Sequence, residues 1–382
     1  MGDATASLFP VDLSVHVLRY PVEHPVRTSF GVMHDRPAVF VRVRDRDGAH
    51  GWGEIWCNFP ACGAEHRARL AETVMRPLLL GREYAGPADA YAHLTAATEV
   101  LALQSGEPGP MAQVIAGVDL ALWDLCARRA GQPLWAYLGG TGDRVSVYAS
   151  GINPDEPERV VQQKFDEGFR AFKLKLGFGK DRDLRNVRQA RRVLGPDVPL
   201  MVDANQGWDA QQAVDMAAAL AEFDIGWLEE PLRADAPMQQ WSELARVSPV
   251  PLAAGENYQG LRTFQAAIDA GFLGVVQPDL AKWGGISGCL PVIRAVRAAG
   301  LRYCPHYLGA GIGLMASAHV LAAVDGMGHG GLLEIDSNDN PLRSLLSAPL
   351  LQLEDGVARL GLAAGIGVEP NLRELRAICG AR

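Results

Sequence analysis

The segment between residues 172 and 256 holds four short apolar runs that each end in charged residues: FKLKLG (172–177), LMVDAN (200–205), GWLEEP (226–231) and LAAGE (252–256). Short apolar runs between turn signals are typical of strands that are buried on both faces. Such strands form parallel sheets with helices packed against them. The charged residues stand at the carboxyl end of each run, so we expect them to share one edge of a parallel sheet.

The same rhythm continues on both sides of this segment, from about Val145 to Asp336. Helical stretches such as DLRNVRQARRVLG and QQAVDMAAALAEF alternate there with strand-like runs at 145–150, 170–176, 198–203, 225–229, 251–255, 273–277, 301–305 and 332–335. Eight such strands with seven intervening helical stretches predict an α/β fold of the (β/α)8 barrel type rather than an open doubly wound sheet. The first strand is not followed by the Gly-x-Gly-x-x-Gly pattern of dinucleotide-binding folds.

The first third of the chain has a different pattern. Residues 12–20, 38–45 and 49–55 alternate apolar and polar, with Asp47-Gly48 as a hairpin signal, and helical spacing follows at 64–80, 86–104 and 111–130. The sequence therefore predicts an α+β domain over residues 1–140, a barrel domain over 141–340 and a C-terminal segment over 341–382. The strand-like LEDGVARLGL (353–362) in that segment is expected to return to the first domain.

Composition limits the classes of function. The 382 residues are 48% hydrophobic and 21% charged, enough for one large core and a smaller partner domain. A formal charge of −8 argues against nucleic acid or an anionic membrane as a partner. The six cysteines offer no four-ligand zinc pattern and are interpreted as reduced thiols. No secretory signal or long uninterrupted apolar stretch is found, so we expect a cytoplasmic protein.

Ionisable side chains stand at the ends of seven consecutive predicted strands. They are Lys173 and Lys175, then Asp203, Glu229, Glu256, Asp279, His306 and Glu334. From Lys175 onward the intervals between them are 28, 26, 27, 23, 27 and 28 residues, each the length of one βα unit. Because active sites of such barrels lie at the carboxyl ends of the strands, we predict an active site at this mouth. The complete ring disfavours a barrel that has lost catalysis and serves only as a binding or structural protein.

Three acidic residues from neighbouring strands, Asp203, Glu229 and Glu256, would repel one another unless a cation lay between them. An all-oxygen set with few protein ligands and open positions favours Mg²⁺ over Ca²⁺ or Zn²⁺. The alternative is that each carboxylate pairs with a nearby Lys or Arg or caps the next helix. Glu230 follows Glu229 and is expected on the opposite face of the strand.

Two pairs of residues are candidates for proton transfer. Lys173 and Lys175 share one face of a strand, about 6.6 Å apart. Repulsion of roughly 2.5 kcal/mol over that distance, with a metal nearby, would lower the pKa of one lysine and let it act as a base. The alternative is two solvated lysines at the rim. Asp279 and His306 end neighbouring strands, where the carboxylate would orient the imidazole and raise its basicity.

Two other motifs have a weaker functional interpretation. His319 lies in the apolar helical stretch SAHVLAA and is predicted to be structural. The glycine-rich run 309–313 follows the seventh strand. It either contacts a carboxylate or phosphate group or simply starts a helix tightly.

The chain resembles the mandelate racemase subgroup of the enolase superfamily, the mandelate racemase/muconate lactonizing enzyme family. The segments that carry the resemblance cover nearly the whole chain: ALWDL (121–125), FKLKLG (172–177), VDAN (202–205), LEEP (228–231), GEN (255–257), QPDLAKWGG (277–285), PHYLG (305–309) and LLE (332–334). The chain departs from many relatives in reading LAAGIGVEP where they carry a Pro-Gly-Leu-Gly run. It also has Asp279 where the muconate-lactonizing branch uses a lysine, and Lys282 is displaced from that position.

The resemblance implies a role for each residue of the ring. Asp203, Glu229 and Glu256 would bind Mg²⁺, Lys175 would be one acid/base with Lys173 as its modulator, and His306 backed by Asp279 would be the opposing acid/base. Glu334 would hydrogen-bond a carboxylate oxygen of a small-molecule substrate, with a further hydrogen bond donated if it were protonated. The first domain and the C-terminal segment would cap the barrel, with loops at 28–34 and 56–60 choosing the substrate. The resemblance also implies a homo-oligomer.

The implied chemistry is abstraction of the proton next to a carboxylate, through an enediolate. Reprotonation from the opposite face would make the enzyme a racemase or epimerase, and loss of a β-hydroxyl would make it a dehydratase. Polar candidates in the capping loops, Thr28, His34, Asp35 and Asn58, together with DSNDN (336–340), favour a polyhydroxy acid. We therefore expect dehydration of an aldonate or aldarate to a 2-keto-3-deoxy acid, with racemisation of a 2-hydroxy acid or cyclic amino acid, or lactone cycloisomerisation, as alternatives.

Overall fold

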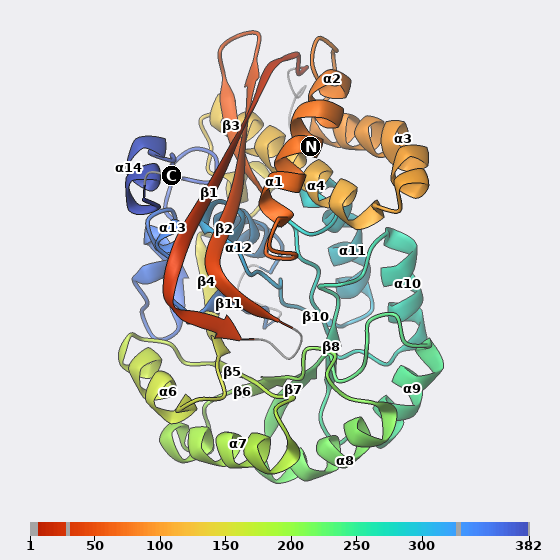
Figure 1. The fold of residues 1–382 in the computed structure, drawn as a ribbon, viewed down its shortest axis with the longest axis vertical. Helices are drawn as coiled ribbons and strands as arrows, with labels where there is room; N and C mark the ends of the chain where they lie inside the picture. Colours follow the sequence, from red (N-terminus) through yellow and green to blue (C-terminus); the bar gives the residue numbers. More distant parts are fainter. Residues whose placement is uncertain (1–6, 28–30, 326–329, 381–382) are drawn as a thin grey trace.

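The N-terminal region forms an antiparallel sheet followed by helices, as predicted. The computed structural model describes residues 7–27, 31–325 and 330–380. The sheet has the order β1 (Pro10–Arg27), β2 (Val32–Asp45) and β3 (His50–Ile55). Gly48 has a φ of 88° in the turn between β2 and β3, which confirms the Asp-Gly hairpin signal. β1 and β2 are longer than expected and extend as a two-stranded arm toward the barrel (Figure 1).

The helices of this region cover one face of the sheet. They are α1 (Gly63–Leu70), the π-helical turn η1 (Ala71–Met75), α2 (Arg76–Leu79), α3 (Pro87–Ser105), α4 (Pro108–Arg129) and α5 (Leu134–Tyr137). A Cβ atom on Gly53 of β3 would lie 1.9 Å from the carbonyl oxygen of Gly117, so glycine is required where β3 crosses α4. α4 is long and apolar enough to cross a membrane, but 83% of its most apolar window is buried within the protein, as expected of a core helix.

The central region contains the eight predicted parallel strands in a curled sheet surrounded by helices (Figure 1). The strands are β4 (Arg144–Ile152), β5 (Phe172–Lys175), β6 (Leu200–Asp203), β7 (Ile225–Glu229), β8 (Leu252–Ala254), β9 (Val275–Val276), β10 (Arg302–Tyr303) and β11 (Leu333–Asp336). The helices are α6 (Pro157–Asp166), α7 (Lys180–Leu194), α8 (Ala210–Leu220) with the 3-10 turn η2 (Ala221–Phe223), α9 (Met238–Val247), α10 (Leu261–Ala270), α11 (Gly285–Ala298) and α12 (Gly311–Asp325). The pairing order β10-β9-β8-β7-β6-β5-β4-β11 confirms the predicted (β/α)8-type fold.

The interior of the barrel is packed with side chains from alternate strand positions. The buried cluster consists of Tyr148, Ala171, Met201, Trp227, Ala253, Val275 and Cys304. Because side chains on a strand repeat every two residues, the residue two positions later points into the barrel just beyond this packed layer. That step leads from Met201 to Asp203, from Trp227 to Glu229 and from Cys304 to His306. The packed layer is therefore the floor of the predicted active site.

The C-terminal segment contains α13 (Pro341–Ser344), the 3-10 turn η3 (Ala348–Leu351), β12 (Val357–Arg359) and α14 (Leu372–Ile378). The strand in 353–362, β12, pairs antiparallel with β4 of the barrel. The end of the same run contacts the first domain, because the indole N–H of Trp135 donates to the carbonyl oxygen of Gly361 at 3.1 Å. Further contacts with the first domain follow a few residues later. Ile366 donates its backbone N–H to Asp124, and Glu369 accepts from the indole N–H of Trp52.

His319 is structural, as predicted, and we expect it to make folding stability depend on pH. It is fully buried in α12, accepts the backbone N–H of Trp135 at 3.1 Å, and burial lowers its pKa to about 4. The unfolded chain would take up a proton at this ring near pH 6.5, whereas the folded protein would not until about pH 4. The free energy of unfolding should therefore fall by about 3 kcal/mol between those values as pH decreases.

Urea unfolding of the wild type and of His319→Gln at several pH values measures this contribution. Between pH 6.5 and 4, the free energy of unfolding of the variant should fall less steeply with decreasing pH than that of the wild type, because the contribution of His319 is missing. An identical pH dependence in both proteins would remove His319 from the account.

Candidate active site

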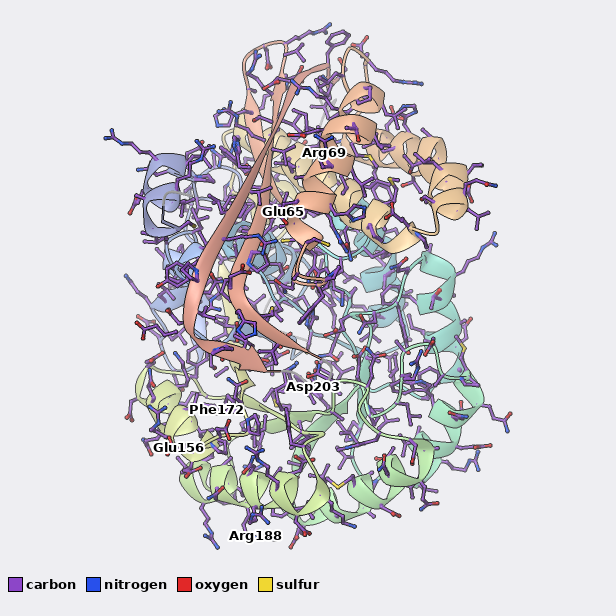
Figure 2. All side chains as sticks on the ribbon, in the orientation of Figure 1. Glu65, Arg69, Glu156, Phe172, Arg188 and Asp203 are labelled. Carbon is purple, nitrogen blue, oxygen red and sulfur yellow. The ribbon has the colours of Figure 1, made fainter. Side chains whose placement is uncertain are left out.

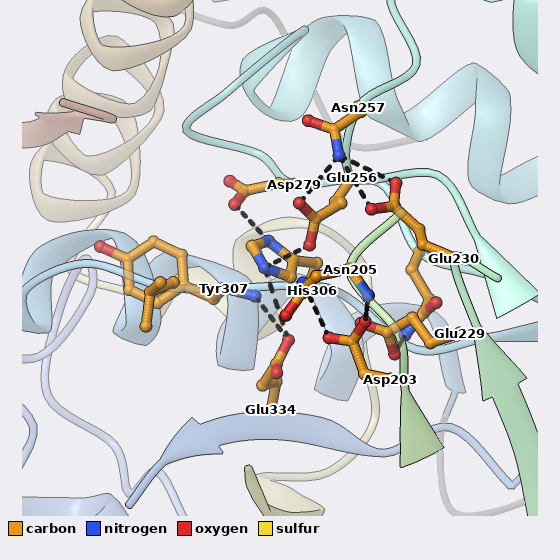
Figure 3. Close-up of polar contacts among 12 residues, drawn as sticks. Asp203, Asn205, Glu229, Glu230, Glu256, Asn257, Asp279, His306, Tyr307 and Glu334 are labelled. Carbon is orange, nitrogen blue, oxygen red and sulfur yellow. Dashed lines mark hydrogen bonds and ion pairs between the residues drawn. The ribbon is translucent and has the colours of Figure 1, made fainter. Parts of the chain in front are cut away.

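The ring of ionisable residues predicted from the strand ends meets at one mouth of the barrel. Lys175, Asp203 and Glu229 end three neighbouring strands and are paired in register, Lys175 with Asp203 and Asp203 with Glu229. Asp203 lies deep in the molecule, close to the lower end of the β1–β2 arm, whereas Glu156 and Arg188 lie on the outside (Figure 2). Figure 3 shows the carboxylates and His306 pointing toward a common space.

Both lysines are bound to carboxylates of this ring. Lys175 Nζ lies 2.6 Å from Asp203 Oδ2. Lys173 Nζ is fully buried, 2.5 Å from Glu229 Oε1 and 2.8 Å from Glu334 Oε1, and lies over the ring of Tyr148. Lys173 is therefore not a solvated rim residue, and it links the carboxylates of two strands.

A lowered lysine pKa was expected beside a metal ion, and the carboxylates of the ring act in the opposite direction. Burial lowers the pKa of Lys175, but the carboxylates of Asp203, Glu229 and Glu334 together outweigh burial and raise that pKa. The pKa of Lys173 is likewise raised well above its ordinary value, because burial is outweighed by Glu229 and Glu334. The sequence argument weighed the repulsion between the two lysines and the charge of a nearby metal, but not the carboxylates that lie at hydrogen-bond distance from them.

His306 is placed between two carboxylates, and its pairing with Asp279 is as predicted. Its Nδ1 atom lies 2.7 Å from Asp279 Oδ2 and its Nε2 atom lies 2.7 Å from Glu256 Oε2. Asp279 is held in turn by the backbone N–H groups of Ala281 and Lys282. Burial works against the charged imidazole, but Glu256 and the other nearby carboxylates hold the pKa of His306 well above its ordinary value.

Glu334 lies at the end of β11 and accepts hydrogen bonds from three sides. Ser150 Oγ and Lys173 Nζ contact Oε1, and the backbone N–H of Tyr307 donates to Oε2 at 3.2 Å. Burial favours the neutral form, but the charges of Lys173, His306 and Lys175 together outweigh burial and lower the pKa of Glu334. The structure therefore favours an ionised Glu334 that accepts hydrogen bonds, not the protonated donor considered from the sequence.

The placement predicted for Glu230 is wrong. Its φ of 39° takes the chain out of the strand after Glu229, so the alternation of side chains no longer applies. Asn257 Nδ2 donates to both Glu230, at 2.8 Å, and Glu256, at 2.9 Å (Figure 3). Burial, followed by the negative charges of Glu256 and Asp203, raises the pKa of Glu230 well above its ordinary value. Glu230 thus belongs to the same acidic group as the predicted ligands.

Glu229 points into the barrel, where several donors surround it. Besides Lys173, it accepts from Gln277 Nε2 at 2.6 Å and from Trp227 Nε1 at 3.1 Å, both on Oε2. Burial raises its pKa to about 7. Gln277 was not predicted as a site residue, although it stands two positions before Asp279, on the same face of the chain.

Within residues 7–27, 31–325 and 330–380, no three Asp, Glu, His or Cys side chains are grouped closely enough to hold a metal ion. Each predicted ligand is paired with a cationic side chain instead, Asp203 with Lys175, Glu229 with Lys173 and Glu256 with His306. The donor set nonetheless fits a hard divalent cation, because it offers only carboxylate oxygens, and Asp203 lies close enough to Glu229 to raise its pKa.

A cavity of about 210 Å³ opens at this mouth. Its lining comes from the barrel and from the first domain, and consists of Trp56, Phe59, Lys175, Asn205, Gln206, Glu256, Asn257, Lys282, His306 and Leu308. A smaller adjoining cavity of about 20 Å³ is lined by Val26, Ser150, Gly151, Asn153, Lys175, His306, Leu308, Glu334, Asp336 and Asn338. Lys175 and His306 thus face the same space, which Val26 of β1 and Trp56 and Phe59 after β3 also line.

The candidates for substrate binding are placed less uniformly. Asn58 is buried, and its amide donates to the carbonyl oxygen of Leu308 at 2.7 Å. His34 is exposed on β2 and is absent from the described lining of both cavities. Thr28 lies outside the described residues. The sequence argument did not single out Asn205, which donates twice to Asp203, or Asn257, which contacts Glu256. Lys282, considered there only as displaced from the lysine of the muconate-lactonizing branch, also contacts Glu256.

Comparison with known proteins identifies the family. Residues 12–139 match the family model described as mandelate racemase / muconate lactonizing enzyme, N-terminal domain, and residues 157–375 match the model described as enolase C-terminal domain-like. A solved structure of a mandelate racemase/muconate lactonizing enzyme from Bordetella bronchiseptica RB50 is 63% identical, with a TM-score of 0.94, over 98% of this chain and 100% of that one.

More distant relatives are named for different reactions. The D-galactarolactone cycloisomerase of Agrobacterium fabrum is 29% identical over 93% of this chain and 95% of its own length. The L-talarate/galactarate dehydratase of Salmonella typhimurium LT2, solved with magnesium and L-lyxarohydroxamate, is 27% identical with a TM-score of 0.83, over 97% of this chain and 93% of that one. The relatives also include an N-succinylamino acid racemase. Relatives in this family are therefore magnesium-containing enzymes with lyase, racemase or isomerase activity, and the present chain is an enzyme of the mandelate racemase/muconate lactonizing enzyme family within the enolase superfamily.

Proposed function

We propose that the enzyme dehydrates an acid sugar, an aldonate or aldarate, to a 2-keto-3-deoxy acid. The observation that carries the proposal is that Lys175 and His306 line two adjoining cavities whose other polar groups are mostly neutral amides and a hydroxyl. Those neutral groups are Asn153, Asn205, Gln206, Asn257, Asn338 and Ser150. Amides and hydroxyls both donate and accept, so they suit a substrate with several hydroxyl groups.

We propose Asp203, Glu229 and Glu256 as the Mg²⁺ ligands, with Asn205 and Asn257 orienting two of them. Magnesium supplies positive charge beside the substrate carboxylate, which makes the neighbouring carbon acidic enough for a side-chain base. Asn205 donates to both oxygens of Asp203, at 2.7 Å from its backbone N–H and 3.1 Å from Nδ2. Such outer contacts fix the direction in which a ligand oxygen points.

The two bases have separate roles in the proposal. Lys175, at the end of β5, takes the proton from the α-carbon. Lys173 modulates the electrostatic environment of Lys175. His306, held by Asp279, protonates the departing β-hydroxyl from the other side. Glu334 accepts hydrogen bonds from Ser150, Lys173 and Tyr307, and so keeps the substrate end of the site rigid. A homo-oligomer remains part of the proposal through the family resemblance, and a cytoplasmic location through the sequence features described above.

Incubation with acid sugars, 2-hydroxy acids and cyclic amino acids in D2O with MgCl2 tests this function. We expect consumption of one or more aldonates or aldarates, with a 2-keto-3-deoxy acid as the product. Exchange of the α-hydrogen with all hydroxyl groups retained would instead support a racemase or epimerase. Conversion of a lactone without dehydration would support a cycloisomerase, the activity of the relative from Agrobacterium fabrum.

The adjacent residues Glu229 and Glu230 allow a matched test of the ligand assignment. Glu229→Gln removes a proposed ligand, whereas Glu230→Gln changes a carboxylate that shares Asn257 with Glu256. We expect Glu230→Gln to weaken Mg²⁺ binding by about 10- to 100-fold, as changes around a ligand shell do, and Glu229→Gln to weaken it further. Isothermal titration with MgCl2 measures both. The opposite order would assign the ligand role to Glu230.

A further inference from the structure

We infer that Glu54 and Asn58, in the first domain, are positioning residues that hold the loop carrying His306 in its catalytic orientation. The inference rests on the proposed role of His306 as an acid/base. Neither residue needs to touch the substrate. Both act through the backbone of residues 307–313, which connects His306 to α12.

Glu54 is a buried carboxylate whose two oxygens are both used by this loop. Its Oε1 atom accepts the backbone N–H of Ala310 at 2.5 Å, and its Oε2 atom accepts the backbone N–H of Gly313 at 2.9 Å. Gly313 is in the first turn of α12, where backbone N–H groups have no partner within the helix. A negative charge is favoured at this end of a helix. The glycine-rich run 309–313 thus binds a carboxylate, and that carboxylate belongs to the protein itself.

The glycines of the same loop are packed closely against Tyr307, and Gly309 also against Glu54. A Cβ atom added to Gly309 would lie 2.5 Å from the Tyr307 hydroxyl and 2.7 Å from Glu54 Oε1. A Cβ atom added to Gly313 would also lie 2.5 Å from that hydroxyl. The Tyr307 ring is therefore enclosed by glycine backbone and by Glu54. Because Tyr307 follows His306 directly, fixing its side chain fixes the backbone that carries the imidazole.

Asn58 contacts the same loop, and Trp56 contacts the turn that holds Asp279, the hydrogen-bond partner of His306. Asn58 Nδ2 donates to the carbonyl oxygen of Leu308 at 2.7 Å. The backbone N–H of Trp56 donates to the carbonyl oxygen of Ala281, in the turn whose N–H groups bind Asp279. One short segment that begins at the end of β3, residues 54–58, thus contacts both loops of the His306–Asp279 pair.

If Glu54 had only a structural role, it would be one of several buried carboxylates that join the first domain to the remainder of the protein. Asp124 is the matched control, since it accepts the backbone N–H groups of Trp52 and Ile366 and is also fully buried. Among the residues that the structure describes, Asp124 forms no hydrogen bond or ion pair with residues 279–282 or 305–313; its partners are Trp52, Arg128 and Ile366. Changing either carboxylate to the amide removes one acceptor oxygen from a buried pair of N–H groups. Both variants should lose stability.

The test compares Glu54→Gln with Asp124→Asn in protein labelled with 15N-histidine and saturated with MgCl2. The Nδ1 and Nε2 signals of His306 are assigned by their loss in His306→Asn. We expect Glu54→Gln to shift or broaden these signals, and Asp124→Asn to leave them unchanged although its melting temperature falls. Unchanged His306 signals in Glu54→Gln, or equal changes in both variants, would overturn the inference.

Asn58→Ala is the second variant, which serves if Glu54→Gln does not fold. It removes one hydrogen bond to Leu308 and should change the same His306 signals. With a substrate found in the D2O experiment, either variant should slow proton transfer at the His306 face on the order of 10²-fold and leave transfer at the Lys175 face unchanged. If the wild type converts no acid sugar to a 2-keto-3-deoxy acid, the proposed function fails, while the imidazole signals still decide the positioning role.

Discussion

Replacing Asp203 with asparagine is expected to abolish Mg²⁺ binding and to lower turnover by at least about 10³-fold. Asp203 is fully buried, and loss of one charged ligand removes several kcal/mol of stabilisation from a metal-dependent transition state. The amide has the same shape, and Asn205 can still contact it, so the barrel should stay folded. Isothermal titration measures Mg²⁺ binding, steady-state kinetics measure turnover, and circular dichroism shows whether the barrel stays folded.

The control for this experiment is Asp209→Asn. Asp209 caps α8 on the outside of the barrel and accepts the backbone N–H of Gln212. That variant should bind Mg²⁺ and turn over substrate as the wild type does. Wild-type turnover of Asp203→Asn at saturating substrate and metal would count against the metal assignment.

Removal of either base is expected to stop proton transfer at one face only. Lys175→Ala should slow exchange of the α-hydrogen by about 10²- to 10⁴-fold at the face that Lys175 serves, which is the usual contribution of a positioned acid or base. His306→Asn should do the same at the opposite face. The reason is that Lys175 ends β5 and His306 follows β10, which lie five positions apart in the sheet order.

Deuterium exchange into each enantiotopic or epimeric position, followed by NMR, measures the two rates separately. Each variant is the control for the other. Loss of exchange at both faces in Lys175→Ala would show that the lysine supports the site as a whole, and unchanged exchange at both faces would remove it from the mechanism.

The ends of the barrel strands could be predicted from the sequence because they depend on local periodicity. Each βα unit repeats after 23 to 28 residues, so the charged residue after each apolar run is found by position alone. Lys175, Asp203 and His306 lie where this repeat places them. The pairing of His306 with Asp279 also follows, because their strands are neighbours in the sheet.

Other features depend on contacts that no local pattern encodes. Glu230 leaves the strand through a positive φ, which an alternation rule cannot anticipate for a glutamate. The bond between Glu54 and Ala310 joins residues 256 positions apart. Asn257 and Asn205 stood within the quoted motifs GEN and VDAN, so a signal for both existed. It was not used, because a neutral amide beside a carboxylate has many structural explanations.

The direction of the lysine pKa shifts also could not be predicted from local sequence patterns. Two lysines on one strand predict mutual repulsion, but the net effect depends on how many carboxylates approach them from other strands. Lys173 lies within 4 Å of Asp203, Glu229 and Glu334, at 3.9, 2.5 and 2.8 Å. Three neighbouring carboxylates outweigh one neighbouring lysine, and the pKa of Lys173 moves upward.

The most direct test is a crystal structure of the enzyme with Mn²⁺ in place of Mg²⁺ and with a carboxylate inhibitor that cannot lose an α-proton. The anomalous signal of Mn²⁺ locates the metal without ambiguity. We predict one peak at about 2.0 to 2.3 Å from oxygens of Asp203, Glu229 and Glu256, with Lys175 and His306 on opposite sides of the inhibitor's α-carbon. A peak bound by other residues, or both bases on the same side of that carbon, would contradict the account.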